Sequence, residues 1–364
     1  PNVVQAQVVN NAAATISLGS LVAIYDGTPK PATATTTPAG LSVAITYDGS
    51  ATPPTNPGSY AVEATSTDPN YSGSASGTKT ISITALVRRA PVVNGSLDGS
   101  VQMMTGEAFS LSNSAWISGD LLVPGTPGVV LTGTPTYGGT VDSIGSVSPT
   151  GYTVALNNTS LVRHVVRRTD PIAFPVVGAP PAPSGTRIVS LTLPGQSPGD
   201  FATLRNLSLN ANAGIIAVPP GTYGSFSASG NSGFVLGVAG ATVPSVYNFQ
   251  SLAVNLLPGN AQIQVLGPIV VNVANGSLMN GAVGSVSHPE WLTLNVTTGG
   301  LTISGNVRFN GIIVAPNSAV TLNGNAILYG NVVADRLTIN GTSLLLDSTP
   351  PTTTAASVEP ELLQ

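Results

Sequence analysis

Few side chains in this sequence could do acid–base or ligand chemistry: 364 residues hold 11 Lys and Arg, 15 Asp and Glu, and two His. The densest group runs from Arg163 to Asp170 and includes His164 and Arg167. Side chains of these types could bind an anionic sugar such as a uronate, as the Arg-rich clefts of solenoid polysaccharide lyases do. A lyase also needs a dense carboxylate cluster to hold Ca²⁺, and the sequence has none. The sequence therefore favours a cationic connector whose arginines pair with Asp170 or neighbouring carboxylates.

The second histidine lies in the group His288-Pro289-Glu290-Trp291. An acid–base pair here would need a further carboxylate, and apart from Glu290 none lies within 40 residues on either side. Because Pro289 indicates a turn, we expect Trp291 to cover an apolar edge. The other tryptophan, Trp116, is far away in the sequence, so the two do not decide whether a glycan binds.

The remaining patterns of catalysis and metal binding are missing from the sequence. It contains no Cys, no His-x-x-x-His, no calcium loop of the Asp-x-Asp-x-Asp-Gly type and no phosphate loop, and its only lysines are Lys30 and Lys79. We therefore expect no catalytic residue, metal site or cofactor, and a protein that is not an enzyme. The net charge of −4 disfavours nucleic acid as a partner. No apolar run of 18 residues is present, so we expect no membrane span.

The elements that carry these residues are predicted to be β-strands. Only 7% of the residues are charged, and the polar positions are filled by Ser, Thr, Asn and Gly, which are poor helix formers. Short segments alternate apolar and polar residues and end in Asn or Gly, as short strands do. With 41 Gly and 30 Pro, turns must be frequent. The fold class is therefore all-β.

A repeated strand-and-turn unit runs through most of the chain. Three copies near the end are Leu301-Thr302-Ile303, Val320-Thr321-Leu322 and Leu337-Thr338-Ile339, spaced by 19 and 17 positions. A unit of this length, with no room for a helix, predicts a β-solenoid whose coils stack inward Leu, Ile and Val. Thr302, Thr321 and Thr338 should then form one outward column. Such a column could order water, as in ice-binding solenoids, or could be an ordinary solvent-facing strand position.

The chain divides by composition into six segments. We expect a β-prone arm over 1–14, an immunoglobulin-like (Ig-like) module over 15–86, solenoid sections over 92–170 and 187–347, a Pro-rich connector over 171–186, and a low-complexity tail over 348–364. Whether the solenoid is continuous across the connector stays open. No signal peptide is visible before Pro1, so the chain is expected to be mature or excerpted.

The second segment resembles the MBG (YDG/YGX-type) Ig-like module of bacterial surface proteins. Five ordered motifs carry the resemblance: Tyr25-Asp26-Gly27-Thr28, Gly40-Leu41-Ser42-Val43, Tyr47-Asp48-Gly49-Ser50, Pro57-Gly58-Ser59-Tyr60-Ala61-Val62 and Asp68-Pro69-Asn70-Tyr71-Ser72-Gly73. The resemblance implies a β-sandwich that acts as a spacer or stalk unit. The alternation of the fourth motif sets Tyr60, Val62 and Ala64 inward.

The last repeats, from Phe309 to Ala334, resemble the β-solenoids of exported bacterial proteins of the choice-of-anchor and ice-binding-like families. Both resemblances imply a secreted or cell-surface location. Solenoid ends expose unpaired strand edges, and the arm holds Val3, Val4, Val8 and Val9 as candidate assembly residues. The predicted function is a structural subunit of a bacterial extracellular filament or surface assembly, a homo-oligomer or polymer joined by strand exchange or end-to-end stacking. The alternatives are a monomeric adhesin that binds a surface glycan or ice, and a solenoid lyase or hydrolase.

Overall fold

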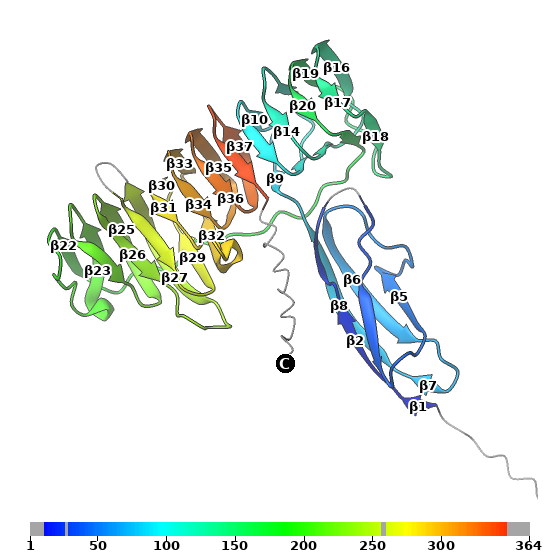
Figure 1. Ribbon diagram of the computed structural model, residues 1–364, viewed down its shortest axis with the longest axis horizontal. Helices are drawn as coiled ribbons and strands as arrows, with labels where there is room; N and C mark the ends of the chain where they lie inside the picture. Colours follow the sequence, from blue (N-terminus) through cyan, green and yellow to red (C-terminus); the bar gives the residue numbers. More distant parts are fainter. Residues whose placement is uncertain (1–10, 26–27, 256–259, 348–364) are drawn as a thin grey trace, which may run out of the picture. The chain divides into compact units, whose positions relative to one another are not determined.

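The computed structural model describes residues 11–25, 28–255 and 260–347, and the chain forms two compact units, Pro1–Ile83 and Thr84–Gln364. Within the described residues every regular element is a β-strand except two single-turn 3₁₀ helices, η1 (Phe201–Thr203) and η2 (Pro289–Trp291). This confirms the prediction of an all-β protein (Figure 1). The division after Ile83 precedes the predicted module boundary at residue 86, because the segment from Ala85 already pairs with solenoid strands.

The first unit contains a four-stranded sheet in the order β3-β8-β6-β5 and two ribbons, β2–β4 and β1–β7. Its strands are β1 (Ala12–Ala13), β2 (Thr15–Gly19), β3 (Val22–Ile24), β4 (Thr33–Thr37), β5 (Val43–Tyr47), β6 (Gly58–Ser66), β7 (Tyr71–Ser72) and β8 (Ser74–Ser82). Alternation along β6 buries Val62 and Ala64 completely, and Tyr60 packs partly buried against the same core. Lys79 is also buried, and its Nζ donates a hydrogen bond to the carbonyl oxygen of Ser20.

The second unit is a parallel β-solenoid with three faces, which we name A, B and C. Successive strands of each coil lie on faces A, B and C in turn. Face C is an 11-stranded sheet, whereas faces A and B are joined into a 16-stranded sheet by long strands that bend from one face to the other. The three-stranded sheet β13-β19-β16 continues face B. A large sheet-lined core confirms the predicted β-solenoid class.

The strand bounds follow this division by face. Face A carries β9 (Ala85–Val87), β12 (Val101–Met103), β15 (Leu121–Leu122), β18 (Thr140–Asp142), β21 (Val165–Arg167), β29 (Ile269–Val273) and β32 (Leu292–Val296). The strands that bend from A to B are β25 (Gly221–Ser229), β27 (Ser245–Asn255), β35 (Ile312–Gly324) and β37 (Val332–Ile339). Face B carries β10 (Val92–Val93), β13 (Phe109–Leu111), β16 (Gly128–Gly133), β19 (Thr153–Asn158), β22 (Arg187–Leu191), β23 (Leu204–Leu209), β30 (Ser277–Asn280) and β33 (Leu301–Gly305). Face C carries β11 (Ser96–Asp98), β14 (Trp116–Ile117), β17 (Thr136–Tyr137), β20 (Leu161–Val162), β24 (Gly214–Ala217), β26 (Ser232–Leu236), β28 (Gln262–Val265), β31 (Ala282–Val283), β34 (Arg308–Asn310), β36 (Ile327–Tyr329) and β38 (Leu344–Leu346).

The alternation of apolar and polar residues explains why these segments form the solenoid. In β33, Leu301 and Ile303 point inward and are at most 1% exposed, whereas Thr302 between them is only half-buried. Successive residues of a strand point to opposite sides, so each such triplet supplies two core side chains. Burying each Leu or Ile contributes about 1.5–3 kcal/mol relative to leaving it exposed. Stacking many coils therefore builds the core.

The coils are not stacked in the order of the chain. Strand β9 enters the middle of the stack, where it pairs with β37 on one side and with β12 on the other. Similarly, β11 lies between β38 and β14. The predicted sections 92–170 and 187–347 thus join through their own strands into one continuous stack (Figure 1).

One further change of order occurs near the end of the stack. The chain places residues 128–142 in the outermost positions and then returns to lay 153–167 beneath them. Strand β19 lies between β13 and β16, β20 lies between β14 and β17, and β21 lies between β15 and β18. Strands β16, β17 and β18 therefore form the edge of the solenoid at this end.

The Pro-rich segment 171–186 runs along the outside of the solenoid rather than between two sections (Figure 1). The guanidinium of Arg88 lies 4.8 Å from the centre of the Phe174 ring. Further along, Thr297 donates a hydrogen bond to the carbonyl oxygen of Gly178, and Gln250 donates one to that of Pro181. The segment carries the chain from the end formed by β16–β18 to the first strand of the opposite end, β22.

Candidate functional site

The three predicted threonines lie in register on face B. Thr302 pairs with Thr321 and Thr321 with Thr338, and all three are half-buried on the outside of the sheet. The column continues as Leu278 on one side and Val92 on the other, so only three adjacent hydroxyls are aligned. Whether this column orders water or binds a glycan stays a prediction.

Two asparagine ladders accompany the outward columns, and the sequence analysis missed both. On face B, Asn340 donates to Asn323 at 2.9 Å and Asn94 donates to Asn340 at 3.1 Å. On face A, Asn295 donates to Asn272 at 2.8 Å and Asn272 to Asn248 at 2.9 Å. Each amide satisfies its neighbour, which indicates a stabilising role. The signal in the sequence was Asn at repeat spacing.

The group Arg163–Asp170 does not form a connector but lies on strands β20 and β21 and their turns. Arg163 makes a two-pronged ion pair with Asp120, with Nε–Oδ1 and Nη2–Oδ2 distances of 2.7 Å each. His164 Nδ1 lies 3.1 Å from the same carboxylate, whose side chain is only 4% exposed. Gly138 passes directly above this corner, where a Cβ atom would come within 2.2 Å of the Arg163 carbonyl oxygen. Sequence analysis missed Asp120.

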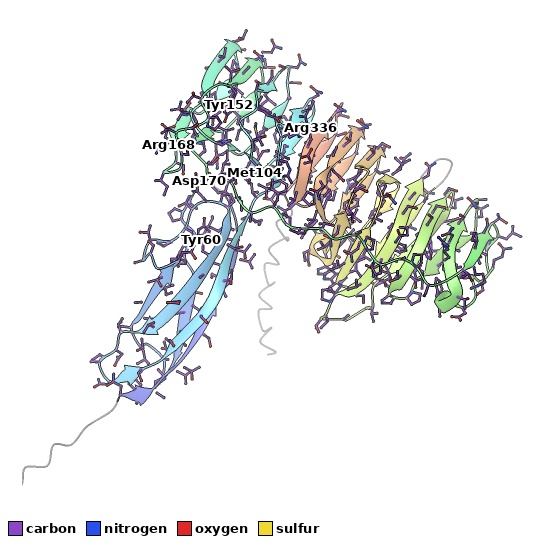
Figure 2. All side chains as sticks on the ribbon, turned by 180° about the vertical axis from the view of Figure 1, so that it is seen from behind. Tyr60, Met104, Tyr152, Arg168, Asp170 and Arg336 are labelled. Atoms are coloured by element: carbon purple, nitrogen blue, oxygen red, sulfur yellow. The ribbon has the colours of Figure 1, made fainter. Side chains whose placement is uncertain are left out.

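The other arginines of this group have separate partners. Arg167 pairs with Asp142 on the edge strand β18, with Nε–Oδ1 at 2.7 Å, and this hydrogen bond is the main reason that the pKa of Asp142 is lowered. Arg168 donates to the carbonyl oxygen of Gly145, and Asp170 accepts from the amide of Ser146. Figure 2 shows Arg168 and Asp170 in the same part of the solenoid as Tyr152, with Arg336 further along the stack. Asp170 is thus not the partner of these arginines.

His288 lies in a different part of the solenoid. Its Nδ1 is 2.9 Å from Glu290, and its ring stacks on Trp291 with centroids 4.0 Å apart and planes within 6°. Trp291 packs its partly buried ring against the core, as a structural role predicts. One face of the indole is therefore covered by imidazole. Trp116 lies on β14 of face C and does not contribute to this cluster.

A third group of charges lies at the middle of the stack. Arg88 and Arg89 both pair with Asp335, at 3.1 and 3.4 Å, and Arg336 pairs with Glu107 at 3.5 Å. These pairs cross the contact between the first and last coils of the unit. Within the described residues, no group of three or more His, Cys, Asp or Glu could hold a metal ion.

The edge strands β16–β18 show an incompletely covered core. Leu131 is aligned with Leu156 of the next coil, but Leu131 is 52% exposed and Leu156 only 1%. The same part of the chain exposes four more large apolar side chains, Val130, Val141, Ile144 and Val147. At the opposite end, Phe201 packs edge-to-face on Tyr223, with centroids 6.2 Å apart, and contacts the core. The predicted assembly residues Val3, Val4, Val8 and Val9 lie outside the described residues.

The fold and these surfaces define an all-β protein in which a small module with a mixed sheet, antiparallel except for the pair β3–β8, precedes a parallel β-solenoid. Residues 14–85 match the family model of the MBG domain, so the module predicted from the five motifs is of the MBG type. Residues 240–350 match the family model of a domain of unknown function, DUF7305. MBG domains are typical of surface proteins.

Neither the curated proteins nor the solved structures gave a match. The resemblance of the solenoid to choice-of-anchor and ice-binding-like proteins therefore gains no support beyond the motifs themselves. In the part of the chain that the structure describes, no helix is long and apolar enough to cross a membrane.

Proposed function

We propose that this protein is a structural subunit of a bacterial extracellular filament or surface assembly, joined to its neighbours at the open end of the solenoid. The observation that carries the proposal is the edge formed by β16, β17 and β18, each of which pairs on one side only among the described residues. Parallel strands with unpaired backbone groups are templates for another chain. Terminal coils of solenoids need a polar cap, and Leu131 is instead left half-exposed.

Two ways of joining are consistent with this edge. In strand exchange, the β-prone arm of a second chain, with Val3, Val4, Val8 and Val9, adds to β16. In end-to-end stacking, β16 of one chain pairs with β22 of the next. The two strands share the inward pattern Val-x-Leu: Val129 and Leu131 in β16, Val189 and Leu191 in β22. Head-to-tail contacts of this kind generate filaments because they do not close on themselves.

Size measurements on matched variants test the proposal. We expect wild type to form regular polymers by electron microscopy and light scattering, and Leu131→Asp to stay monomeric. Val246→Asp is the control, because Val246 is similarly exposed, at 46%, but lies on β27 within the stack. Deleting residues 1–10 should abolish polymers formed by strand exchange and spare those formed by stacking. A wild-type protein that stays monomeric at high concentration would contradict both.

We also propose that the protein is not an enzyme. The residues that a polysaccharide lyase would need are distributed over separate contacts with carboxylates: Arg163 and His164 with Asp120, Arg167 with Asp142, and His288 with Glu290. Each of these side chains has its own carboxylate partner, which supports structural roles. An assay for release of unsaturated sugars from polygalacturonate should therefore show none, and activity that is lost in His164→Ala would reverse this conclusion.

A further inference from the structure

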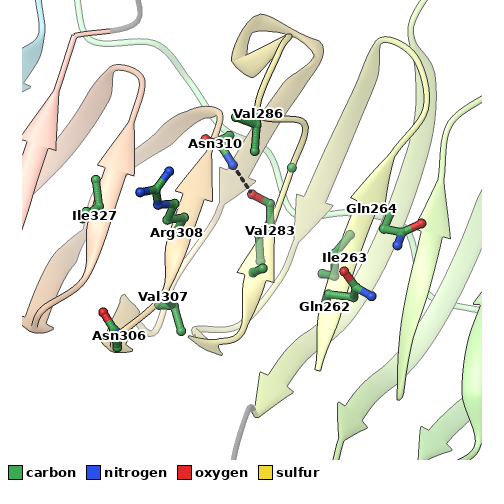
Figure 3. Close-up of a pocket in the computed structure, with 12 residues that line it drawn as sticks. Gln262, Ile263, Gln264, Val283, Val286, Asn306, Val307, Arg308, Asn310 and Ile327 are labelled. Atoms are coloured by element: carbon green, nitrogen blue, oxygen red, sulfur yellow. Dashed lines mark hydrogen bonds between the residues drawn. The ribbon is translucent and has the colours of Figure 1, made fainter. Parts of the chain in front are cut away.

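A groove crosses face C where the strands become short. Strand β31 has only two residues, and it lies between β28 and β34. The groove has a volume of about 490 Å³, within the range of small-ligand sites. Gln262 and Gln264 form one wall, Asn306 and Arg308 the other (Figure 3).

The floor of the groove is set by small residues. Gln262 pairs with Ala282, and the pairing of Val283 with Phe309 places Arg308 on the other side of Ala282. The walls are therefore two strand spacings apart, about 10 Å. Because long side chains line both walls and the small Ala282 lies between them, a channel runs along β31.

Gly284 lies at the end of the floor, where the chain passes close to Asn310 of β34. Its φ is +91°, and a Cβ atom there would lie 2.0 Å from the carbonyl oxygen of Asn310. A side chain at this position would collide with Asn310, which is buried and donates a hydrogen bond to Val283 at 3.3 Å (Figure 3). Val286 follows two residues after Gly284; its side chain is 73% exposed and forms an apolar end of the groove.

Apart from Asn310, the polar side chains that line the groove make no hydrogen bond or ion pair with the described residues. No carboxylate of the described residues lies within ion-pair distance of Arg308, whose guanidinium lies 5.7 Å from the centre of the Tyr329 ring. The amides of Gln262 and Gln264 likewise make no hydrogen bond to any described residue. The lining contains no Asp or Glu. Although the chain has a net charge of −4, the only charged side chain that lines this groove is the cation of Arg308.

We propose that this groove binds an acidic polysaccharide. Arg308 would pair with an anionic group of the sugar, because a guanidinium matches carboxylates and sulfates in two-pronged geometry. The amides of Gln262 and Gln264 can each donate to and accept from hydroxyls. Val286 would contact the C–H face of a ring. A peptide is disfavoured, because β31 is paired on both sides and offers no edge for strand addition.

Calorimetric titration of the full chain with oligogalacturonate tests the proposal. We expect wild type to bind, Arg308→Gln to lose at least about tenfold in affinity, and Ala282→Gln, which fills the floor, to lose binding. The matched control is Arg205→Gln: Arg205 is also exposed, no described carboxylate pairs with it, and it lies on β23 away from the groove. Its affinity should stay within about twofold of wild type.

Three further probes separate the sources of the anion. Cellohexaose, which is neutral, should bind much more weakly than oligogalacturonate. A sulfated oligosaccharide that binds with the same dependence on Arg308 would support the proposal and extend the ligand to sulfated glycans. The proposal would be overturned if Arg308→Gln bound as tightly as wild type, or if Arg205→Gln lost as much affinity as Arg308→Gln. It would also be overturned if neither anionic sugar bound, or if only polyglutamate bound. Because the groove lies away from the β16–β18 edge, a chain that never polymerises can still bind, so this test is independent of assembly.

Discussion

Two arginine–aspartate pairs near the open end have the same two-pronged geometry but differ in burial. The carboxylate of Asp120 is 4% exposed beside Arg163, whereas that of Asp142 is 42% exposed beside Arg167. A buried charge that loses its partner stays poorly solvated, whereas an exposed one is solvated by water. The two pairs therefore allow a matched comparison.

We predict that Arg163→Ala lowers the free energy of unfolding by about 2–4 kcal/mol and Arg167→Ala by less than about 1 kcal/mol. The difference arises because Arg163→Ala removes the guanidinium from a carboxylate that is only 4% exposed, whereas Arg167→Ala removes it from one that is 42% exposed. Urea denaturation of both variants, followed by circular dichroism, measures it. Equal losses in the two variants would show that burial of Asp120 does not govern the pair.

We predict that the solenoid loses stability at alkaline pH because Tyr152 and Tyr223 are buried. Burial raises the pKa of Tyr152 and of Tyr223 to about 12, from 10.0. The folded state holds these protons more tightly, so the stabilisation is fully present below pH 10 and is lost as the pH rises from 10 to 12. The effect reaches about 2–3 kcal/mol for each tyrosine.

Ultraviolet titration of tyrosinate should therefore show these tyrosines ionising near pH 12, together with loss of the solenoid's circular dichroism. Tyr152→Phe should remove its share of the alkaline loss, although it also removes the hydrogen bond to Pro124. Ionisation of every tyrosine near pH 10 with the fold intact would contradict the assignment.

At the scale of the strand, alternation and turn residues were enough to predict the coils. Leu301, Ile303, Val320 and Leu322 are all at most 1% exposed, as the triplets require. The register of the threonine column also followed from aligning the triplets, although Thr302, Thr321 and Thr338 are spaced by 19 and 17 positions. Both depend only on the two-residue period of a strand and on the length of one coil.

The order of the coils could not be predicted in the same way. Strands β16, β19 and β22 have similar inward Val-x-Leu patterns. No local sequence feature therefore shows that residues 153–167 lie beneath residues 128–142. The partner of Arg163 is 43 positions away, and the walls of the groove come from β28 and β34. These contacts follow from stacking order, which a single sequence does not display.

The face-A asparagine ladder should contribute measurably to stability. Asn272 lies in its middle, donating to Asn248 and accepting from Asn295. We predict that Asn272→Ala lowers the free energy of unfolding by about 1–3 kcal/mol, because both neighbours lose a partner. Thr321→Ala, a half-buried outward change on face B, should lower it by less than about 1 kcal/mol. Thermal denaturation compares the two variants. An equal loss of stability in both would show that the asparagine ladder contributes no more than an ordinary outward residue.

The connector predicts a specific result of cleavage. Since β9 pairs directly with β37, and β11 with β38, the two sections do not depend on residues 171–186 to stay together. A protease site inserted after Gly178, once cut, should give fragments that co-elute in size-exclusion chromatography. Separation of the fragments under native conditions would mean that the connector, rather than strand pairing, holds the stack.

At the scale of the whole molecule, the chain contains two cores of unequal size. Val62, Tyr47 and Ala32 form the core of the MBG-type unit, whereas the solenoid has its own much larger core, which includes Leu322. The division lies at Ile83 and Thr84, where no strand is shared. A unit with its own core is expected to unfold as its own cooperative transition.

We therefore predict two transitions by differential scanning calorimetry of the full chain. Val62→Ala should lower the midpoint of one transition and leave the other unchanged, and Leu322→Ala should do the reverse. Leu322 is completely buried, so its truncation should lower the stability of the solenoid by about 2–5 kcal/mol. Val62 is equally buried but lies in the smaller unit, which makes the pair a matched test. If both variants shift a single common transition, the two units are energetically coupled, and the view of the first unit as an independent spacer would have to be abandoned.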